Sequence, residues 1–278
     1  MGRLAQNGRF LGRRFQRARR GRVLTRAWRP IATIMLTTAL ALAVALALAA
    51  TVDLLAATWA KGLGEPVRHD FQIITRYGKS DWLLIVAAVV CMILLFCDWT
   101  RTSRLIATAW SEVGFIAAFL FFAIATGGIS VNIIKQFVGR ARPRLLPGEG
   151  PLSFDPFAFQ SSFQSFPSGH AQVMGALAAT AVLVSPRYAA VVVVPCLIVA
   201  ASRVIVGAHY VGDVLAGLLL GAGFAWLYAV AFAEVGIGFY RDGNGAILAR
   251  TAAIKRAGAG PMFKGLWSAL IGEGKKLA

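Results

Sequence analysis

The segment from Ile31 to Thr51 contains no charged residue and consists only of Ala, Leu, Ile, Val, Met and Thr. At about 1.5 Å of rise per residue, a helix of this length crosses the hydrocarbon core of a bilayer, which is about 30 Å thick. The pattern predicts an all-α fold, a polytopic membrane helical bundle with about six transmembrane helices. Five further apolar stretches follow, at about Trp82–Phe96, Val113–Ile134, Ala171–Val184, Tyr188–Val206 and Val211–Phe232.

The composition excludes an ordinary soluble domain. Hydrophobic residues make up 58% of the chain and charged residues 15%, whereas soluble domains contain about 45–50% and about 25%. The formal net charge is +17, but the basic residues lie at the two ends and between the apolar stretches, which is typical of membrane orientation rather than of nucleic-acid binding. Cys91, Cys97 and Cys196 lie in apolar stretches, so they predict neither a disulfide framework nor a metal cluster.

The first 29 residues carry ten arginines and no acidic residue, and an apolar run follows. A secretory signal has a shorter apolar region, of about 7–15 residues, so we interpret the run as a retained anchor. Six spans place both chain ends on one side of the membrane, and the excess of Lys and Arg predicts that this side is the cytoplasm. The segment from Lys135 to Phe166 then faces outward, which is the periplasm for a bacterial inner membrane.

Ionisable residues at the ends of membrane spans are costly and usually functional. Three separate span ends of this chain carry such residues, and the predicted orientation places all of them near the outer face. Their convergence on one face predicts a single site. They are Lys135 and Arg142 after the third span, His170 at the start of the fourth, and Arg203, His209 and Asp213 around the turn between the fifth and sixth.

The basic residues and the helix start suit an anion. Lys135, Arg142 and Arg203 supply fixed positive charge, and a guanidinium group matches phosphate oxygens two at a time. Ser168 and Gly169 open the fourth span, where the free backbone N–H groups of a helix N-terminus attract an anion and the absent glycine side chain allows close approach. The sequence therefore predicts a phosphate site.

Two histidines and one aspartate provide groups for phosphoryl transfer. His209 and Asp213 are four residues apart, so they share one face if the sixth helix begins by His209. A carboxylate bonded to one imidazole nitrogen fixes the tautomer and leaves the other nitrogen free to attack phosphorus. His170, on another span, can protonate the leaving oxygen, so the three residues predict a nucleophile, its orienting partner and a general acid.

These residues fall in three motifs, K-x6-R-P (Lys135 to Pro143), P-S-G-H (Pro167 to His170) and S-R-x5-H-x3-D (Ser202 to Asp213). Together the motifs resemble the signature of the type 2 phosphatidic acid phosphatase superfamily, the integral-membrane lipid phosphate phosphatases. The resemblance implies metal-independent hydrolysis through a phosphohistidine. It implies these roles: His209 as nucleophile, Asp213 as its orienting partner, His170 as general acid, and Lys135, Arg142, Ser168, Gly169 and Arg203 as a phosphate cradle.

We therefore predict a basic cytoplasmic arm at 1–29, a six-helix transmembrane phosphatase domain at 30–234 with the signature at 135–213, and a basic, amphipathic cytoplasmic tail at 235–278. The predicted activity removes phosphate or pyrophosphate from a membrane lipid, without metal, cofactor or nucleic acid. The site does not select among phosphatidate, phosphatidylglycerol phosphate, a polyprenyl diphosphate and the lipid A phosphates, and the oligomeric state stays open. A phosphotransferase with a lipid acceptor and a non-catalytic lipid-binding protein are the alternatives.

Other residues near the signature have weaker assignments. Arg140 and Arg144 flank the site without a catalytic role, and a second phosphate or the lipid headgroups are their expected partners. The phenylalanines between Phe154 and Phe166 are explained either by packing against the helix ends or by an interfacial flap that guides a lipid to the site. The GxxxG at 217–221 predicts close helix packing within the bundle.

Overall fold

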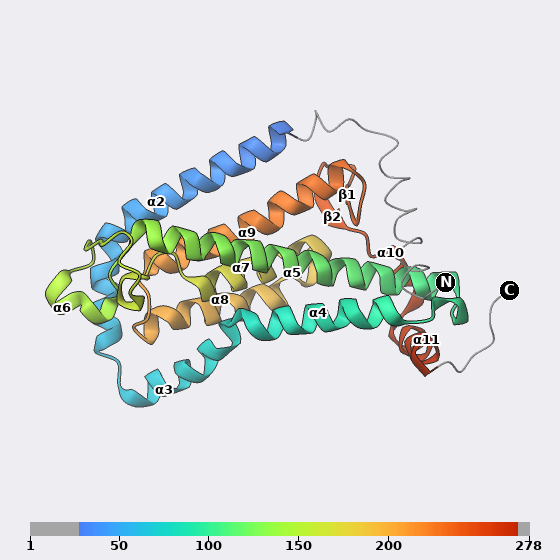
Figure 1. The fold of residues 1–278 in the computed structure, drawn as a ribbon, viewed down its shortest axis with the longest axis horizontal. Helices are drawn as coiled ribbons and strands as arrows, with labels where there is room; N and C mark the ends of the chain where they lie inside the picture. Colours follow the sequence, from blue (N-terminus) through green and yellow to red (C-terminus); the bar gives the residue numbers. More distant parts are fainter. Residues whose placement is uncertain (1–27, 272–278) are drawn as a thin grey trace. The chain divides into compact units, whose positions relative to one another are not determined.

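The structure, a computed structural model, describes residues 28–271 (Figure 1). The predicted basic arm at 1–29 lies almost wholly outside this range. The chain divides into two compact units, one built from Ile31–Leu83 and Phe122–Leu227 and the other from Leu84–Phe121 and the residues from Tyr228 onward. We call the first the site unit, because it contains every predicted site residue, and the second the tail unit.

Each apolar stretch of the sequence forms a helix, so the predicted helical membrane fold is confirmed. Within the described part of the chain, three helical segments are long and apolar enough to cross a membrane, Glu65–Phe96, Arg104–Val138 and Val211–Glu234. Two of the remaining helices are apolar but shorter, and the number of spans stays a prediction. The helices are α2 (Trp28–Lys61), α4 (Ser80–Phe96), α5 (Arg104–Val138), α7 (Gly169–Val184), α8 (Ala190–Ile205) and α9 (Val211–Glu234).

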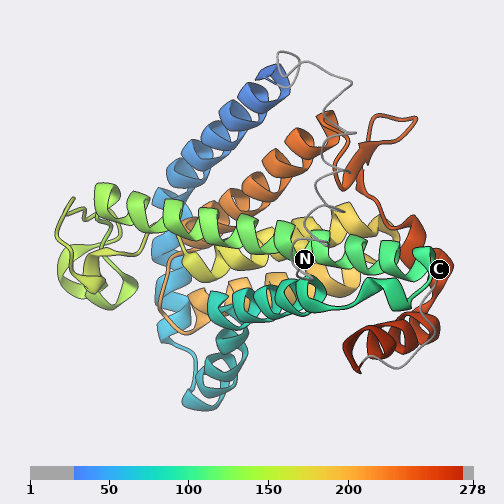
Figure 2. The same ribbon diagram turned by 45° about the vertical axis from the view of Figure 1, so that its right-hand side comes forward.

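Close backbone packing joins α7 to α9 in the site unit. A Cβ atom at Gly217 would overlap the carbonyl oxygen of Ser168, and one at Gly221 would overlap that of Gln172. The predicted packing of the GxxxG within the bundle is therefore confirmed, and it holds the start of α7 against α9. α8 follows α7 through the 3-10 turn η6 (Pro186–Tyr188) and runs beside it in both views (Figures 1 and 2).

Two connecting regions of the site unit contain short helices. The connection between α5 and α7 is tied down by backbone hydrogen bonds, since the N–H of Ser165 donates to the carbonyl of Arg140 over 3.0 Å. This hydrogen bond brings the end of the connection, just before the second motif, next to Arg140 of the first motif. The short helices are α3 (Glu65–Ile74) and η2 (Thr75–Gly78) between α2 and α4, and η4 (Pro143–Leu145), α6 (Leu146–Glu149) and η5 (Ser161–Phe163) between α5 and α7.

The tail unit also contains a β-hairpin, which the sequence analysis did not predict. Strands β1 (Phe239–Arg241) and β2 (Ile247–Ala249) pair antiparallel. The turn between them includes Gly245 at φ +82, a conformation that residues with side chains rarely adopt. The chain after β2 forms α10 (Ala252–Ala257) and α11 (Ala259–Ile271). The remaining tail-unit helix is η3 (Trp99–Arg101).

The last helix, α11, exposes several apolar side chains. Phe263, Trp267 and Leu270 are exposed on α11 at a spacing of three and four residues, so they form one apolar face. Met262 is buried in a cluster of the tail unit that also contains Ile106. One side of α11 therefore packs inside the tail unit while the other side exposes apolar side chains, and an amphipathic cytoplasmic tail stays a prediction.

Candidate active site

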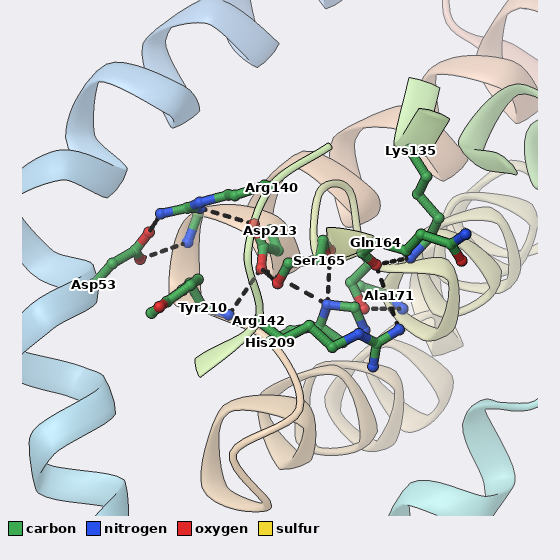
Figure 3. Close-up of polar contacts among 12 residues, drawn as sticks. Asp53, Lys135, Arg140, Arg142, Gln164, Ser165, Ala171, His209, Tyr210 and Asp213 are labelled. Carbon is green, nitrogen blue, oxygen red and sulfur yellow. Dashed lines mark hydrogen bonds and ion pairs between the residues drawn. The ribbon is translucent and has the colours of Figure 1, made fainter. Parts of the chain in front are cut away.

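The three predicted motifs come together in the site unit (Figure 3). Lys135 lies in the last turn of α5, and Arg142 follows in the connection to α7. Arg203 lies in the last turn of α8, and Asp213 lies in the first turn of α9. Because three helix ends supply them, residues up to 78 positions apart in the sequence become neighbours.

His209 is buried in the turn between α8 and α9. Its Nδ1 atom lies 2.8 Å from the carbonyl oxygen of Ser165 and 3.7 Å from Oδ2 of Asp213. A carbonyl oxygen only accepts hydrogen bonds, so Nδ1 carries the proton and Nε2 keeps its lone pair. Nε2 is therefore the nitrogen that can attack phosphorus. The condition that the sixth helix begins by His209 is not met, because α9 begins at Val211.

The Asp213 carboxylate is fully buried and accepts three hydrogen bonds. Its Oδ2 atom accepts from the Ser165 hydroxyl over 2.5 Å and from the backbone N–H of Tyr210 over 2.9 Å. Its Oδ1 atom accepts from Nη1 of Arg140 over 2.8 Å. Asp213 thus holds both the residue that orients His209 and the backbone next to His209. It acts on the imidazole more through these neighbours than by direct contact.

The electrostatic environment keeps the His209 imidazole neutral. Burial lowers the pKa of His209 to about 4, and the Asp213 carboxylate opposes that shift. At pH 7 the ring is therefore unprotonated at one nitrogen, as a nucleophile requires. Burial, and then the positive charge of Arg144, also lower the pKa of Arg142, but a guanidinium group starts from so high a pKa that it stays charged.

Two cations of the first motif meet at one backbone oxygen. Lys135 Nζ donates to the carbonyl of Gln164 over 2.6 Å, and Arg142 Nη2 donates to the same oxygen over 3.3 Å. The buried Nε–H groups of Arg142 and Arg203 have no hydrogen-bond partner among the described residues. Buried charged donors are expensive to leave unpaired, so these groups fit an anion with several acceptor oxygens, such as phosphate.

The third motif also contacts η2, in a region for which the sequence predicted no site residue. Arg203 Nη1 donates to the hydroxyl of Thr75 in η2 over 2.8 Å. A Cβ atom at Gly78, the last residue of η2, would lie 2.7 Å from Cδ2 of His170. Glycine at this position therefore lets η2 approach the imidazole closely. The sequence carries no motif that marks Thr75 or Gly78.

The start of α7 forms as predicted. Ser168 is the N-cap residue, and its side chain accepts from the N–H of Ala171 over 3.5 Å. The N–H of Ser168 donates to the backbone carbonyl of Asp213 over 2.9 Å, which joins the second motif to the third. A Cβ atom at Gly169 would meet nothing closer than Val131 at 3.8 Å, so protein packing does not require glycine there.

Arg140 and Asp53 lie closer to the catalytic motif than the sequence analysis expected. Arg140 is 1% exposed and bonds to two carboxylates, so it does not reach the headgroups. Asp53, the first charged residue after the apolar run that ends at Thr51, lies inside α2 and is also buried. A charged residue within an apolar helix is the signal that could have identified Asp53. The motif spacing contains no such signal for Arg140.

Comparison with known proteins identifies the family. The family model described as PAP2 superfamily matches residues 116–236. A lipid A 1-phosphatase of Rhizobium johnstonii is 39% identical over 190 residues, which are 66% of this chain and 76% of that protein. A lipid A 1-phosphatase of Rhizobium etli is 36% identical over 184 residues, 64% of this chain and 77% of that protein.

Two further proteins are also similar to this chain. An undecaprenyl-diphosphatase of Sulfolobus acidocaldarius is 41% identical over 158 residues, 55% of this chain and 65% of that protein. The crystal structure of a transmembrane PAP2 type phosphatidylglycerolphosphate phosphatase from Bacillus subtilis matches 71% of this chain and 92% of that chain, at 23% identity and a TM-score of 0.48. The motifs, their convergence in the site unit, the family model and the identity over 76% of the Rhizobium johnstonii protein agree, and the chain belongs to the PAP2 superfamily.

Proposed function

We propose that this chain removes the 1-phosphate of a lipid A-type glycolipid at the periplasmic face of the inner membrane. As a PAP2 superfamily member it is an integral-membrane lipid phosphatase, a hydrolase. The observation that carries the proposed chemistry is the buried His209, whose Nδ1 is bonded to the carbonyl of Ser165, so that Nε2 keeps its lone pair. The names of the two Rhizobium relatives support lipid A as the substrate.

The proposed reaction has two phosphoryl-transfer steps. Nε2 of His209 attacks phosphorus in line, the bond from phosphorus to the lipid oxygen breaks, and His170, which must enter this step as an imidazolium, donates a proton to that oxygen. Water then attacks the phosphohistidine and gives a proton to His170, while the bond between phosphorus and Nε2 breaks. Inorganic phosphate leaves, and both imidazoles return to their starting protonation states.

The phosphate cradle supplies charge stabilisation in both steps. Lys135, Arg142 and Arg203 are close enough for their positive charges to act on one another, so an anion with two negative charges relieves their mutual repulsion. The N-terminus of α7 adds the backbone N–H group of Gly169, whereas the N–H of Ser168 is already bonded to the carbonyl of Asp213. Preorganised donors of this kind stabilise the charge that develops on the equatorial oxygens of the phosphoryl group.

The proposed lipid path uses an exposed apolar stripe beside the site. Ile129, Ile133 and Phe137 are 60%, 53% and 63% exposed and follow one another at four-residue intervals along α5. The ring of Phe157 lies 5.0 Å from that of Phe137, and the ring of Phe159 lies 6.4 Å farther on. The stripe thus continues from the membrane helix onto the connection that also carries Gln164 and Ser165.

Backbone conformation supports the same lipid path. Phe157 and Phe159 have φ values of 62 and 53, which are uncommon for bulky residues. Both side chains are nevertheless exposed, at 51% and 71%. Packing against the helix ends does not account for exposed rings held in a costly backbone conformation, so contact with lipid is the better explanation.

A substrate panel tests the proposed function. The purified protein in detergent receives lipid A, phosphatidylglycerol phosphate, undecaprenyl diphosphate and phosphatidate, and released inorganic phosphate is measured. We expect the highest kcat/KM for lipid A, and no release by His209→Ala. Preference for another lipid would refute the substrate assignment while keeping the chemistry. Transfer of phosphate to a lipid without free phosphate would identify a phosphotransferase, and a cellular role that survives His209→Ala would identify a binding protein.

A further inference from the structure

Arg140 is the centre of a buried ionic group in the site unit (Figure 3). Its Nη2 atom lies 2.7 Å from Oδ2 of Asp53, and its Nη1 atom lies 2.8 Å from Oδ1 of Asp213. Nε and Nη2 also donate to the carbonyl of Pro151, over 3.2 and 2.9 Å. The guanidinium carbon lies 4.4 Å from the ring centroid of Tyr210. All three nitrogen atoms of the Arg140 guanidinium group therefore donate to protein acceptors.

Asp53 also reaches the backbone next to the site. Its Oδ1 atom accepts from the N–H of Gly212 over 2.9 Å, while Oδ2 binds Arg140. Asp53 thus contacts the residue before Asp213 and the side chain that binds Asp213. This carboxylate lies in α2, outside the residues 116–236 that match the family model. Helix α2 is thus joined to the start of α9 in two ways, directly at Gly212 and through Arg140 at Asp213.

Buried charges of this kind are costly unless they are well paired, because each loses its hydration. Asp53, Arg140 and Asp213 are at most 1% exposed, so removing one of them leaves uncompensated charge on the others. Apolar packing would stabilise this region at least as well. Stability alone therefore does not explain why charged residues are buried here. Their contact with Asp213 indicates that they position its carboxylate.

We propose that Asp53 and Arg140 are positioning residues, which hold the Asp213 carboxylate in place without contacting the phosphate. Asp213 in turn holds the hydroxyl of Ser165, whose carbonyl orients His209. The inference rests on the proposed function, because it assumes that His209 is the nucleophile. Misplacing a reacting group by about 1 Å costs on the order of a hundredfold in rate, so the arrangement affects kcat more than substrate binding.

The first test is Asp53→Asn, which removes the charge and keeps an oxygen for the N–H of Gly212. We expect kcat for lipid phosphate release to fall roughly tenfold to a hundredfold. The KM and the inhibition constant of inorganic phosphate should stay within about threefold, because the phosphate cradle is untouched. A purely structural role would lower the yield and the unfolding temperature in detergent but not the kcat of the folded fraction.

Two variants of Arg140 test the geometry. Arg140→Lys keeps the positive charge but reaches only one carboxylate, so its kcat should lie between those of wild type and Arg140→Gln. The double variant Asp53→Asn with Arg140→Gln should lose about as much as Arg140→Gln alone, because the two residues act as one unit. Asp98→Asn, which removes the ion pair with Arg101 in the tail unit, is the matched control and should keep wild-type kcat.

The outcomes are separable. Wild-type kcat in folded Asp53→Asn overturns the proposal, and so does a raised KM with unchanged kcat. If Asp53→Asn does not fold, the double variant decides, since it removes two opposite buried charges together. Wild-type kcat in the folded double variant overturns the proposal, and low kcat with normal KM supports it. Absence of phosphate release by the wild-type protein would instead refute the proposed function.

Discussion

The carbonyl oxygen of Ser165 lies 2.8 Å from Nδ1 of His209, whereas the nearest carboxylate oxygen of Asp213 lies 3.7 Å from the same atom. The imidazole is therefore oriented first by a backbone group, and the carboxylate fixes the segment that carries this group. Side-chain substitution cannot remove a carbonyl, so variants of the two residues should differ in their effects.

Asp213→Asn should lower kcat by about 10³–10⁴, as loss of an orienting aspartate does in other enzymes. The amide would face three donors, from Ser165, Tyr210 and Arg140, with one oxygen. Ser165→Ala removes one of these donors but keeps the carbonyl on His209, so we expect a loss of about tenfold only. Single-turnover release of phosphate by the folded variants measures both. Equal losses of kcat in the two variants would show that Asp213 acts only through its hydrogen bond with the Ser165 hydroxyl.

The pH profile follows from the neutral state of His209. Its pKa is lowered to about 4 by burial, so the nucleophilic form is present above pH 4 and is lost only below it. We expect the His209-dependent acidic limb of kcat/KM to lie well under the ordinary histidine pKa of about 6.5. Rates of lipid phosphate release between pH 3.5 and 8 check this. Half-maximal activity near pH 6.5 would contradict a buried neutral imidazole.

The stability of the folded protein should also fall as the pH decreases. The unfolded chain binds a proton at His209 near pH 6.5, while the folded protein resists it down to about pH 4. The contribution of His209 to stability is thus complete above pH 6.5 and falls as the pH decreases toward 4. Thermal unfolding in detergent should show a decline in this window that is smaller in His209→Gln, which carries no titrating group.

Gly78→Ala should disturb His170. The added methyl group would lie 2.7 Å from Cδ2 and 3.1 Å from Cβ of that residue, too close for ordinary contact. We expect kcat to fall on the order of a hundredfold, because the ring must move by a sizeable fraction of an ångström. Gly148→Ala is the matched control, since a Cβ atom there meets nothing within 4 Å. Wild-type kcat in Gly78→Ala would argue against His170 as the general acid.

Phe157→Ser and Phe159→Ser should affect lipid substrates selectively. Each change removes an exposed aromatic ring from the proposed lipid path, and burying one such ring in apolar surroundings is worth about 1.5–3 kcal/mol. We expect kcat/KM for lipid in vesicles to fall at least tenfold, with turnover of a soluble phosphate ester unchanged. Tyr188→Ser removes an equally exposed ring at the turn between α7 and α8 and serves as control. Equal losses on both substrates would refute the lipid path.

The sequence alone was sufficient for the helical elements and for the motif residues. Apolar runs and charges at their ends are local properties, and the spacing from Ser202 to Asp213 is contained in one segment. The GxxxG at 217–221 correctly predicted close helix packing, because small residues permit such packing whichever helix is the partner. These features depend on neighbours within a few turns of the chain, so they can be read without coordinates.

Tertiary structure alone decided which distant groups complete the site. Asp53 reaches Arg140 across 87 positions, and Arg203 reaches Thr75 across 128. A charge count along the chain treats such residues as interchangeable and gives none of them a partner. The choice of partner is made when helix packing excludes water, because a buried charge must then find an opposite charge or a hydrogen bond nearby. Hydropathy and motif spacing determine where a helix ends, but only the packed bundle determines which residues its end meets.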